Sequence, residues 1–390
     1  MSILHLTLVF MLVAAVISLV AERFRLPYTI ALVIAGLAAG TLHVFPPVSI
    51  TPEVLLTLLI PPLLFEGALY LPPADLRAYG WLIGLLAVPG TLIAAVAIGG
   101  AAEAVFRLPP RTAFLLGAIA AAIDPVSVIA LVREMCLDTR LGAILEGEAV
   151  LNDGVAIVLF TIVTGAGGAG LSDAVERFFW LVGVGGAVGV ALGGAVCYAL
   201  DRIHLPLVEA LSSLILLVGS LVLADALGAS GVIAAMCAGV VLGSYGRSRL
   251  TEVGRETVRT LWDVIAFLAN SVLFLFIGLQ VPGRLLLRYW PLIAVVIVAA
   301  VAVRALTVSG FSAICQNAGV SIPTAWRRLL VWGGLRGGVA VALVLDLPAT
   351  VPGRDAISAA VFGLVLFTLL GQGLTVRAVM RRAGLLPQSA

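Results

Sequence analysis

The chain has 390 residues, of which 62% are hydrophobic and only 11% are charged, and its formal net charge is +2. About 25% of the residues of a soluble globular protein are charged, so this chain has too few charges to cover a soluble surface of its size. The composition excludes a soluble enzyme, a nucleic-acid-binding protein and a disordered chain. Apolar blocks of about 20 residues, the length that spans a bilayer, recur along the sequence and predict an all-α polytopic membrane protein.

Thirteen apolar segments are expected to cross the membrane, joined by short loops, with no inserted soluble domain and no regulatory tail. Their approximate ranges are 3–21, 28–44, 50–70, 79–105, 112–132, 140–164, 177–200, 206–226, 230–245, 258–280, 289–314, 325–346 and 356–380. No basic region precedes the first segment and no small-residue cleavage site follows it, so we expect it to be retained as a helix.

The arginines of the loops predict the orientation of the chain. All 23 basic residues are arginine, and cytoplasmic loops of membrane proteins carry an excess of basic residues. An N-terminus outside and a C-terminus in the cytoplasm put most loop arginines inside. Those left outside are Arg107, Arg111, Arg177, Arg284, Arg288 and Arg354. We therefore expect a multi-pass protein of the cell membrane with this orientation.

Four charged side chains are predicted near the middle of the membrane, where a charge costs several kcal/mol and needs a partner or a function. Asp124 and Asp153 lie in the fifth and sixth segments, and Arg304 and Arg336 lie in the eleventh and twelfth. Glu148 lies about one turn from Asp153 on the cytoplasmic side. Five acidic residues nearer to segment ends are expected to be solvated, namely Glu66, Glu146, Glu209, Asp225 and Asp263.

The fifth and twelfth segments are both expected to be interrupted. Pro125 follows Asp124 and removes a helical N–H at mid-depth, and four glycines surround Arg336 in WGGLRGGVA. Arg336 can satisfy freed carbonyls or the Asp124 carboxylate, and the two charges can offset half-helix dipoles. Because these segments are seven apart and run in opposite directions, segments 1–6 and 8–13 are expected to be inverted repeats. Broken helices at matching positions of two such halves indicate a transporter's binding site.

The sixth segment places two acids on different faces of one helix. Glu148 and Asn152 are four residues apart on one face, so the Asn152 amide is expected to hydrogen-bond the Glu148 carboxylate. Asp153 is turned away from Glu148 by about 140° and is expected to face a cavity. Glu148 is expected to pair with Arg304 in a contact that is structural rather than ion-binding.

Four motifs occur in the order found in a known family, namely PPLLFEGAL (61–69), IDPVSV (123–128), EGEAVLNDG (146–154) and GGLRGGVA (333–340). Nearly the whole chain resembles the sodium/hydrogen exchangers, in particular the prokaryotic monovalent cation:proton antiporters with an Asn-Asp pair. The resemblance implies thirteen helices and a homodimer. Residues 1–78 and 206–282 would form the interface domain, 79–164 and 289–382 the moving core domain, and 165–205 a connecting helix.

The resemblance also implies where the transported ion binds. Asp153 would carry the cation or the proton by turns, and Asp124 would help to form the site where the broken helices cross. Many relatives have Thr at the position of Ile123, which offers only its backbone carbonyl, and Ser at the position of Ala149. Na⁺ is the expected cation, but the loss of these hydroxyl groups leaves Li⁺ and K⁺ as alternatives.

Four other residues have supporting roles by the same resemblance. Glu148 and Arg304 would form an interhelical pair, and Asn152 would position that glutamate. Arg336 would stabilise the broken twelfth helix.

The exchange is expected to be one cation for one proton. An unpaired carboxylate is costly to move through a dry interior, so Asp153 would cross with either a proton or a cation bound. Electrogenic relatives carry two acids and a lysine at the corresponding places, whereas this chain has Asn152–Asp153 and no lysine. The expected partners are membrane lipid, a second copy of the chain, monovalent cations and protons. The four cysteines form no CxxC motif, so neither a disulfide framework nor a metal site is expected from them. No cofactor is expected.

Other classes of function fit less well. An intramembrane enzyme would need a catalytic motif, but His5, His43 and His204 are isolated and no HExxH, GxSxG or GxGD sequence occurs. A cation channel is the nearer alternative, although paired broken helices favour alternating access. The buried Asp153 argues against an anion carrier.

Overall fold

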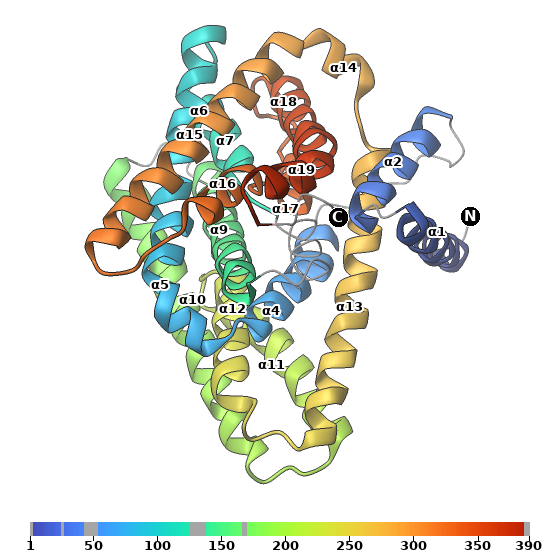
Figure 1. Ribbon diagram of the computed structural model, residues 1–390, viewed down its shortest axis with the longest axis vertical. Helices are drawn as coiled ribbons and strands as arrows, with labels where there is room; N and C mark the ends of the chain where they lie inside the picture. Colours follow the sequence, from blue (N-terminus) through green and yellow to red (C-terminus); the bar gives the residue numbers. More distant parts are fainter. Residues whose placement is uncertain (1–2, 25–26, 43–53, 125–137, 166–169, 386–390) are drawn as a thin grey trace.

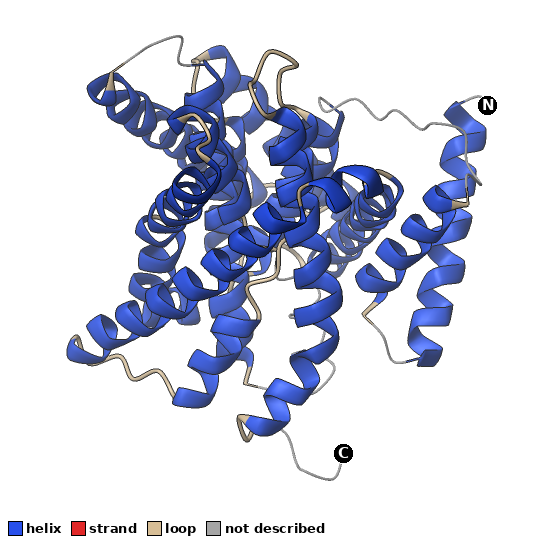
Figure 2. Cartoon of the chain, turned by 90° about the horizontal axis from the view of Figure 1, so that it is seen from above, coloured by secondary structure: helices blue, strands red, loops and turns tan. Residues whose placement is uncertain are grey.

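The computed structural model describes residues 3–24, 27–42, 54–124, 138–165 and 170–385. This part of the chain is helical and contains no strand (Figure 2). Apolar sequence in a bilayer forms helices because a helix pairs its own backbone N–H and C=O groups. The helices and π-helical turns are α1 Ile3–Phe24, α2 Tyr28–Thr41, η1 Leu55–Leu59, α4 Ile60–Tyr70, α5 Pro73–Ala87, α6 Pro89–Phe106, α7 Pro110–Ala121, α9 Thr139–Gly165, α10 Leu171–Leu200, α11 Pro206–Ala226, α12 Gly231–Val241, η2 Leu242–Gly246, α13 Glu252–Leu279, α14 Gly283–Arg288, α15 Trp290–Asn317, α16 Thr324–Trp332, α17 Gly338–Leu345, α18 Arg354–Leu366, η3 Phe367–Gly373 and α19 Leu374–Arg382.

Each predicted segment overlaps one helix or consecutive helices of this set. By length and composition, seven helical stretches within the described ranges are able to cross a membrane, namely Pro73–Phe106, Thr139–Gly165, Leu171–Leu200, Pro206–Ala226, Glu252–Leu279, Trp290–Asn317 and Arg354–Arg382. The remaining apolar helices are shorter, so the count of thirteen crossings stays a prediction. The fourth segment begins at Pro73, earlier than predicted, because proline is well accommodated in the first turn of a helix.

The helices pack in two groups that meet around α9 and α17 (Figure 1). In one group the long helix α13 contacts α2, α4 and α11, and α12 contacts α4, α10 and α11. In the other, α6 packs on α7 and α15, α5 packs on α9, and α15 packs on α18. Both α9 and α17 contact α4 or α13 as well as α7, and they therefore lie between the two groups.

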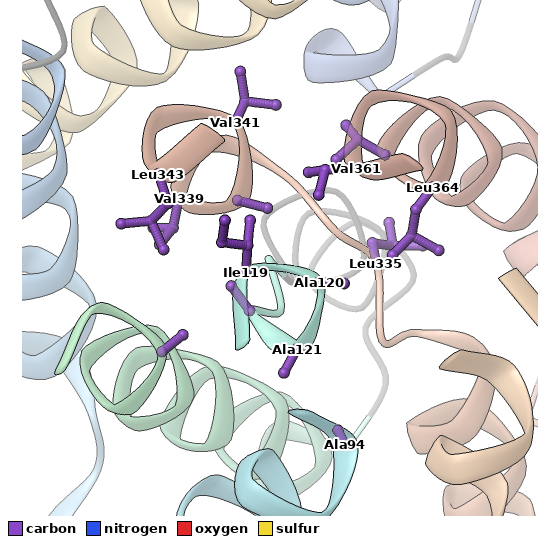
Figure 3. Packing of buried hydrophobic residues seen from close by; sticks show 14 of the residues in the cluster. Ala94, Ile119, Ala120, Ala121, Leu335, Val339, Val341, Leu343, Val361 and Leu364 are labelled. Carbon is purple, nitrogen blue, oxygen red and sulfur yellow. The ribbon is translucent and has the colours of Figure 1, made fainter. Parts of the chain in front are cut away.

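The large apolar core includes the place where α17 meets the end of α7. Residues Gly338 to Val344 of α17 are all buried. Figure 3 shows Val339 of α17 beside Ile119 near the end of α7. Only Leu345 of α17 is partly exposed, so this short helix has almost no surface for lipid and is held in position by other helices.

Glycine allows close contact between α2 and α13. A Cβ atom on Gly36 would overlap the backbone of α13, and one on Gly278 would overlap the backbone of α2. Small residues let membrane helices approach until their backbones touch. This contact fixes α2 against the C-terminal half of α13.

Candidate functional site

The two segments predicted to be broken meet through their backbones. Helix α7 ends at Ala121, and residues 333–337 separate α16 from α17. The Asp124 N–H donates to the Leu335 carbonyl at 2.8 Å, so the two interruptions cross at this point. The C-terminal part of the fifth segment, including Pro125, lies outside the described residues, as does Cys136.

Charged side chains satisfy the helix ends that these breaks create. Arg336 Nη1 donates to the carbonyls of Ala121 at 2.7 Å and Ala122 at 3.1 Å, at the C-terminal end of α7. The Gly338 N–H, in the first turn of α17, donates to Asp124 Oδ2 at 3.4 Å. A cation therefore lies at a helix C-terminus and an anion at a helix N-terminus, the arrangement that offsets the helix dipoles. Both placements agree with the sequence prediction.

The backbone between Arg336 and α17 has no space for a side chain beside Asp124. A Cβ atom on Gly337 would collide with the Asp124 carboxylate. The Arg336 N–H donates to Thr368 Oγ1 at 3.0 Å, which ties the same stretch to the π-helical turn η3. The glycines of the motif thus allow the broken segment to lie directly against the acid.

Asn152 does not make the predicted hydrogen bond to Glu148, and this prediction was wrong. Its Nδ2 group donates to Thr91 Oγ1 and to the Ala121 carbonyl at 3.2 Å, and its Oδ1 accepts from the Ile123 N–H at 2.7 Å. The break after α7 leaves backbone groups without helical partners, and the buried amide satisfies them instead. Asn152 therefore positions the end of α7 rather than the glutamate.

Glu148 and Arg304 form a buried ion pair between α9 and α15, as predicted. The pair has two contacts, from Arg304 Nη1 to Glu148 Oε1 and from Nη2 to Oε2, the second at 2.9 Å. Only 1% of Glu148 and 6% of Arg304 is exposed. Arg304 Nε also donates to the Leu330 carbonyl at 3.0 Å, in the last turn of α16. The pair thus supports the broken twelfth segment and does not line the cavity described next.

Asp153 and Asp124 line one cavity of about 90 Å³ between α4, α9, α13 and α17. Asp153 is 7% exposed, and its Oδ1 atom has no hydrogen-bond partner among the described residues. A buried carboxyl oxygen without a partner is costly unless a proton or a cation binds to it. Ala149 lines the same cavity and brings no hydroxyl group to it. The position of the Ile123 carbonyl relative to a bound ion stays a prediction.

Three polar residues that the sequence analysis did not assign to the site also line this cavity. They are Glu66 from α4, Glu146 from α9 and Asn270 from α13. Glu66 and Glu146 are half-buried there, so their expected solvation stays a prediction. Helical spacing could have indicated Glu146, since it is seven residues from Asp153 and therefore lies on the same face of α9. No comparable signal in the residues themselves indicated Asn270.

Glu209 was also expected to be solvated, and this prediction was wrong. It is 1% exposed and accepts hydrogen bonds from the Thr251 N–H and hydroxyl, both at 3.2 Å, at the start of α13. Its role is to satisfy a helix N-terminus. Within the described ranges, no three His, Cys, Asp or Glu side chains are grouped so as to hold a resident metal ion.

The sequence model for the transmembrane region of sodium/hydrogen exchangers matches residues 8–382, nearly the whole chain. The chain belongs to the sodium/hydrogen exchanger family. It is 38% identical over 384 residues to the Na(+)/H(+) antiporter ApNhaP of Aphanothece halophytica, covering 96% of this chain and 73% of that protein. It is 37% identical over 347 residues to the Na(+)/H(+) antiporter NhaP of Pseudomonas aeruginosa, covering 85% and 81%.

The fold of this exchanger is that of a solved family structure. The sodium proton antiporter MjNhaP1 from Methanocaldococcus jannaschii matches with a TM-score of 0.79 over 97% of both chains, at 19% sequence identity. This likeness confirms the predicted all-α polytopic membrane fold.

Thr91 is expected to act as a positioning residue for the exchanger's site. Thr91→Val keeps the shape but removes the acceptor of Asn152 Nδ2, and a buried donor left without a partner costs about 1–3 kcal/mol. We expect the apparent affinity for the transported cation to fall roughly tenfold, as about 1.4 kcal/mol would give. The measurement is the cation dependence of ΔpH dissipation in proteoliposomes. Thr91→Ser keeps the hydroxyl group and should retain the apparent cation affinity of the unmodified protein.

Thr112→Val is the matched control for this substitution. Thr112 is also buried, but its hydroxyl donates to the Pro352 carbonyl at 3.2 Å, at the other end of α7. Unchanged cation dependence in Thr91→Val would show that Asn152 holds the break without the threonine.

Proposed function

We propose that this protein is a Na⁺/H⁺ antiporter that exchanges one cation for one proton by alternating access. The observation that carries this proposal is the buried Asp153 carboxyl group, whose unpartnered oxygen lies in a cavity shared with Asp124. Membership of the exchanger family and relatives named as Na(+)/H(+) antiporters support the reaction.

Competition at Asp153 would couple the two ions. Bound Na⁺ or a bound proton neutralises the carboxylate, whereas an empty carboxylate is expensive to move through a membrane interior. Asp124 accepts a hydrogen bond from the first turn of α17, so it shapes the cavity and adds negative charge to it. Each change of access would therefore carry one ion or the other.

The lack of lysine in the chain supports electroneutral exchange. Arg336 contacts the carbonyls that end α7, and Arg304 pairs with Glu148, so both mid-depth arginines already have partners. With the Asp153 carboxyl group as the carrier, each cation would be exchanged for a single proton.

The arrangement in the membrane follows the sequence analysis. The proposed interface domain is 1–78 and 206–282, the moving core is 79–164 and 289–382, and 165–205 connects the inverted repeats. The chain would form a homodimer in the cell membrane, with its N-terminus outside and its C-terminus in the cytoplasm. The excess of arginine in the inner loops supports this orientation.

The decisive test uses purified protein in liposomes with an imposed pH gradient. Addition of Na⁺ should dissipate the gradient, and a membrane-potential dye should report no change driven by transport. The same assay with Li⁺ and K⁺ tests the alternatives left by Ala149. Current carried by a cation without proton movement would identify a channel and contradict the proposal, and a dye response driven by Na⁺ would contradict electroneutrality.

A further inference from the structure

A second cavity lies away from the ion site, where the ends of α15, α16 and α19 meet. Its volume is about 430 Å³. Arg327 and Arg328 from α16 and Arg382 from α19 line it, and none of the described residues in its wall is acidic. Helix α16 packs on both α15 and α19, so residues more than fifty positions apart in sequence surround one space (Figure 1). Arg328 and Arg382 are exposed and Arg327 is half-buried, so water screens part of the repulsion among the three charges, and an anion bound between them would offset the rest.

Another cavity of the molecule shows how arginines are balanced where no outside anion is needed. It lies at the start of α13, and three arginines and three acids line it, namely Arg247, Arg255, Arg259, Glu252, Glu256 and Asp263. Arg259 Nε lies 3.7 Å from Asp263 Oδ2. The contrast indicates that the α15–α16–α19 cavity is built to receive negative charge from outside the chain.

The arginines of this cavity have guanidinium N–H groups that are available to bind a ligand. Arg327 Nε donates to the Ile322 carbonyl at 3.1 Å, which fixes the side chain and leaves its terminal nitrogens for a ligand. Arg328 and Arg382 make no ion pair within the described ranges. Guanidinium groups bind phosphate oxygens through paired hydrogen bonds, which favours a phosphate ligand.

Apart from Ser309 and Thr324, the rest of the cavity wall is apolar. Val331 and Trp332 from α16 and Val379 from α19 contribute to it. On the neighbouring helix α15, Leu306 is 73% exposed and Ile314 is 50% exposed, as expected for a surface against lipid chains. A ligand that fits both parts has a phosphate group at one end and a hydrocarbon chain at the other.

We infer that this cavity binds the headgroup of an anionic phospholipid, with its phosphate at Arg327, Arg328 and Arg382. The site lies on the side of the membrane where the C-terminus emerges, which in the proposed orientation is the inner leaflet. Basic residues at that surface attract anionic lipid by about 1 kcal/mol each. Bound lipid would join α16 to α19 next to the break at 333–337, where Trp332 Nε1 already donates to Thr375 Oγ1 at 3.0 Å.

The test measures thermal unfolding of the full chain in detergent with added lipid. Phosphatidylglycerol should raise the unfolding midpoint by a few degrees, because a ligand that binds only the folded state stabilises it. Phosphatidylcholine should not. The variant with Arg327→Gln, Arg328→Gln and Arg382→Gln should lose the shift, and native mass spectrometry should show the corresponding loss of bound phosphatidylglycerol.

Matched variants and ligands separate this site from general charge effects. Arg247→Gln, Arg255→Gln and Arg259→Gln together remove the same charge at the balanced cavity, and this variant should keep the phosphatidylglycerol shift. If the first triple variant does not fold, Arg328→Gln alone should reduce the shift. An equal shift with inorganic phosphate, or with phosphatidylcholine, would overturn the proposal, as would a full shift in the Arg327, Arg328 and Arg382 variant. None of these outcomes depends on which ions are exchanged.

Discussion

Asp153→Asn is expected to reduce cation/proton exchange to the rate of liposomes without protein. Asparagine has nearly the same volume as aspartate, so the packing of α9 should be kept. Its amide cannot take up a proton in the physiological range and carries no charge to bind a cation. The measurement is Na⁺-driven dissipation of ΔpH at equal amounts of incorporated protein, with the unfolding midpoint recorded in parallel.

A second aspartate supplies the control. Asp225 lies exposed near the end of α11, and Asp225→Asn should leave exchange unchanged. If Asp153→Asn folds and still exchanges Na⁺ for protons, then the assignment of the carrier is wrong, and Glu66 and Glu146 in the same cavity become the acids to test.

Glu148→Gln is expected to reduce the yield of folded protein far more than it changes ion selectivity. The substitution leaves the Arg304 guanidinium buried without its charged partner. Removing one member of a buried ion pair typically costs about 3–5 kcal/mol. The yield can be measured as the monodisperse fraction in size-exclusion chromatography after detergent extraction, and selectivity as the ratio of Na⁺ to Li⁺ exchange in whatever protein is recovered.

The double variant Glu148→Gln with Arg304→Met tests the reason for this loss. Without the stranded positive charge, its yield should exceed that of Glu148→Gln alone. A changed Na⁺/Li⁺ ratio with normal yield in the single variant would instead place Glu148 in the ion site.

The broken helices and the buried ion pair could be predicted because charged residues and helix-breaking residues are energetically costly inside a membrane. A proline after Asp124 and glycines around Arg336 have few uses inside a bilayer segment other than to interrupt it. The partnership of Glu148 with Arg304 followed because few mid-depth charges of opposite sign are present. Because so few charged residues lie at mid-depth and each one needs a partner or a function, the sequence leaves few possible pairings among them.

The hydrogen-bond partners of Asn152 and the burial of Glu209 could not be predicted, because they depend on contacts between segments that the sequence alone does not locate in space. Asn152 satisfies the Ile123 N–H, which lacks a partner only because α7 ends at Ala121. The burial of Glu209 depends on the start of α13, which lies more than forty residues further along the chain. Distance from the end of its own segment predicts that Glu209 is solvated, because that distance says nothing about the neighbouring helix that covers it.

The bond that joins the two broken helices connects main-chain atoms, from the Asp124 N–H to the Leu335 carbonyl. Most substitutions at these two positions keep this main-chain hydrogen bond. A deep mutational scan would therefore detect the side chains at the crossing but not the hydrogen bond between the two backbones. Proline at position 124 is the exception, since it has no N–H to donate. Main-chain links of this kind allow extensive sequence drift, which is consistent with a fold retained at 19% identity.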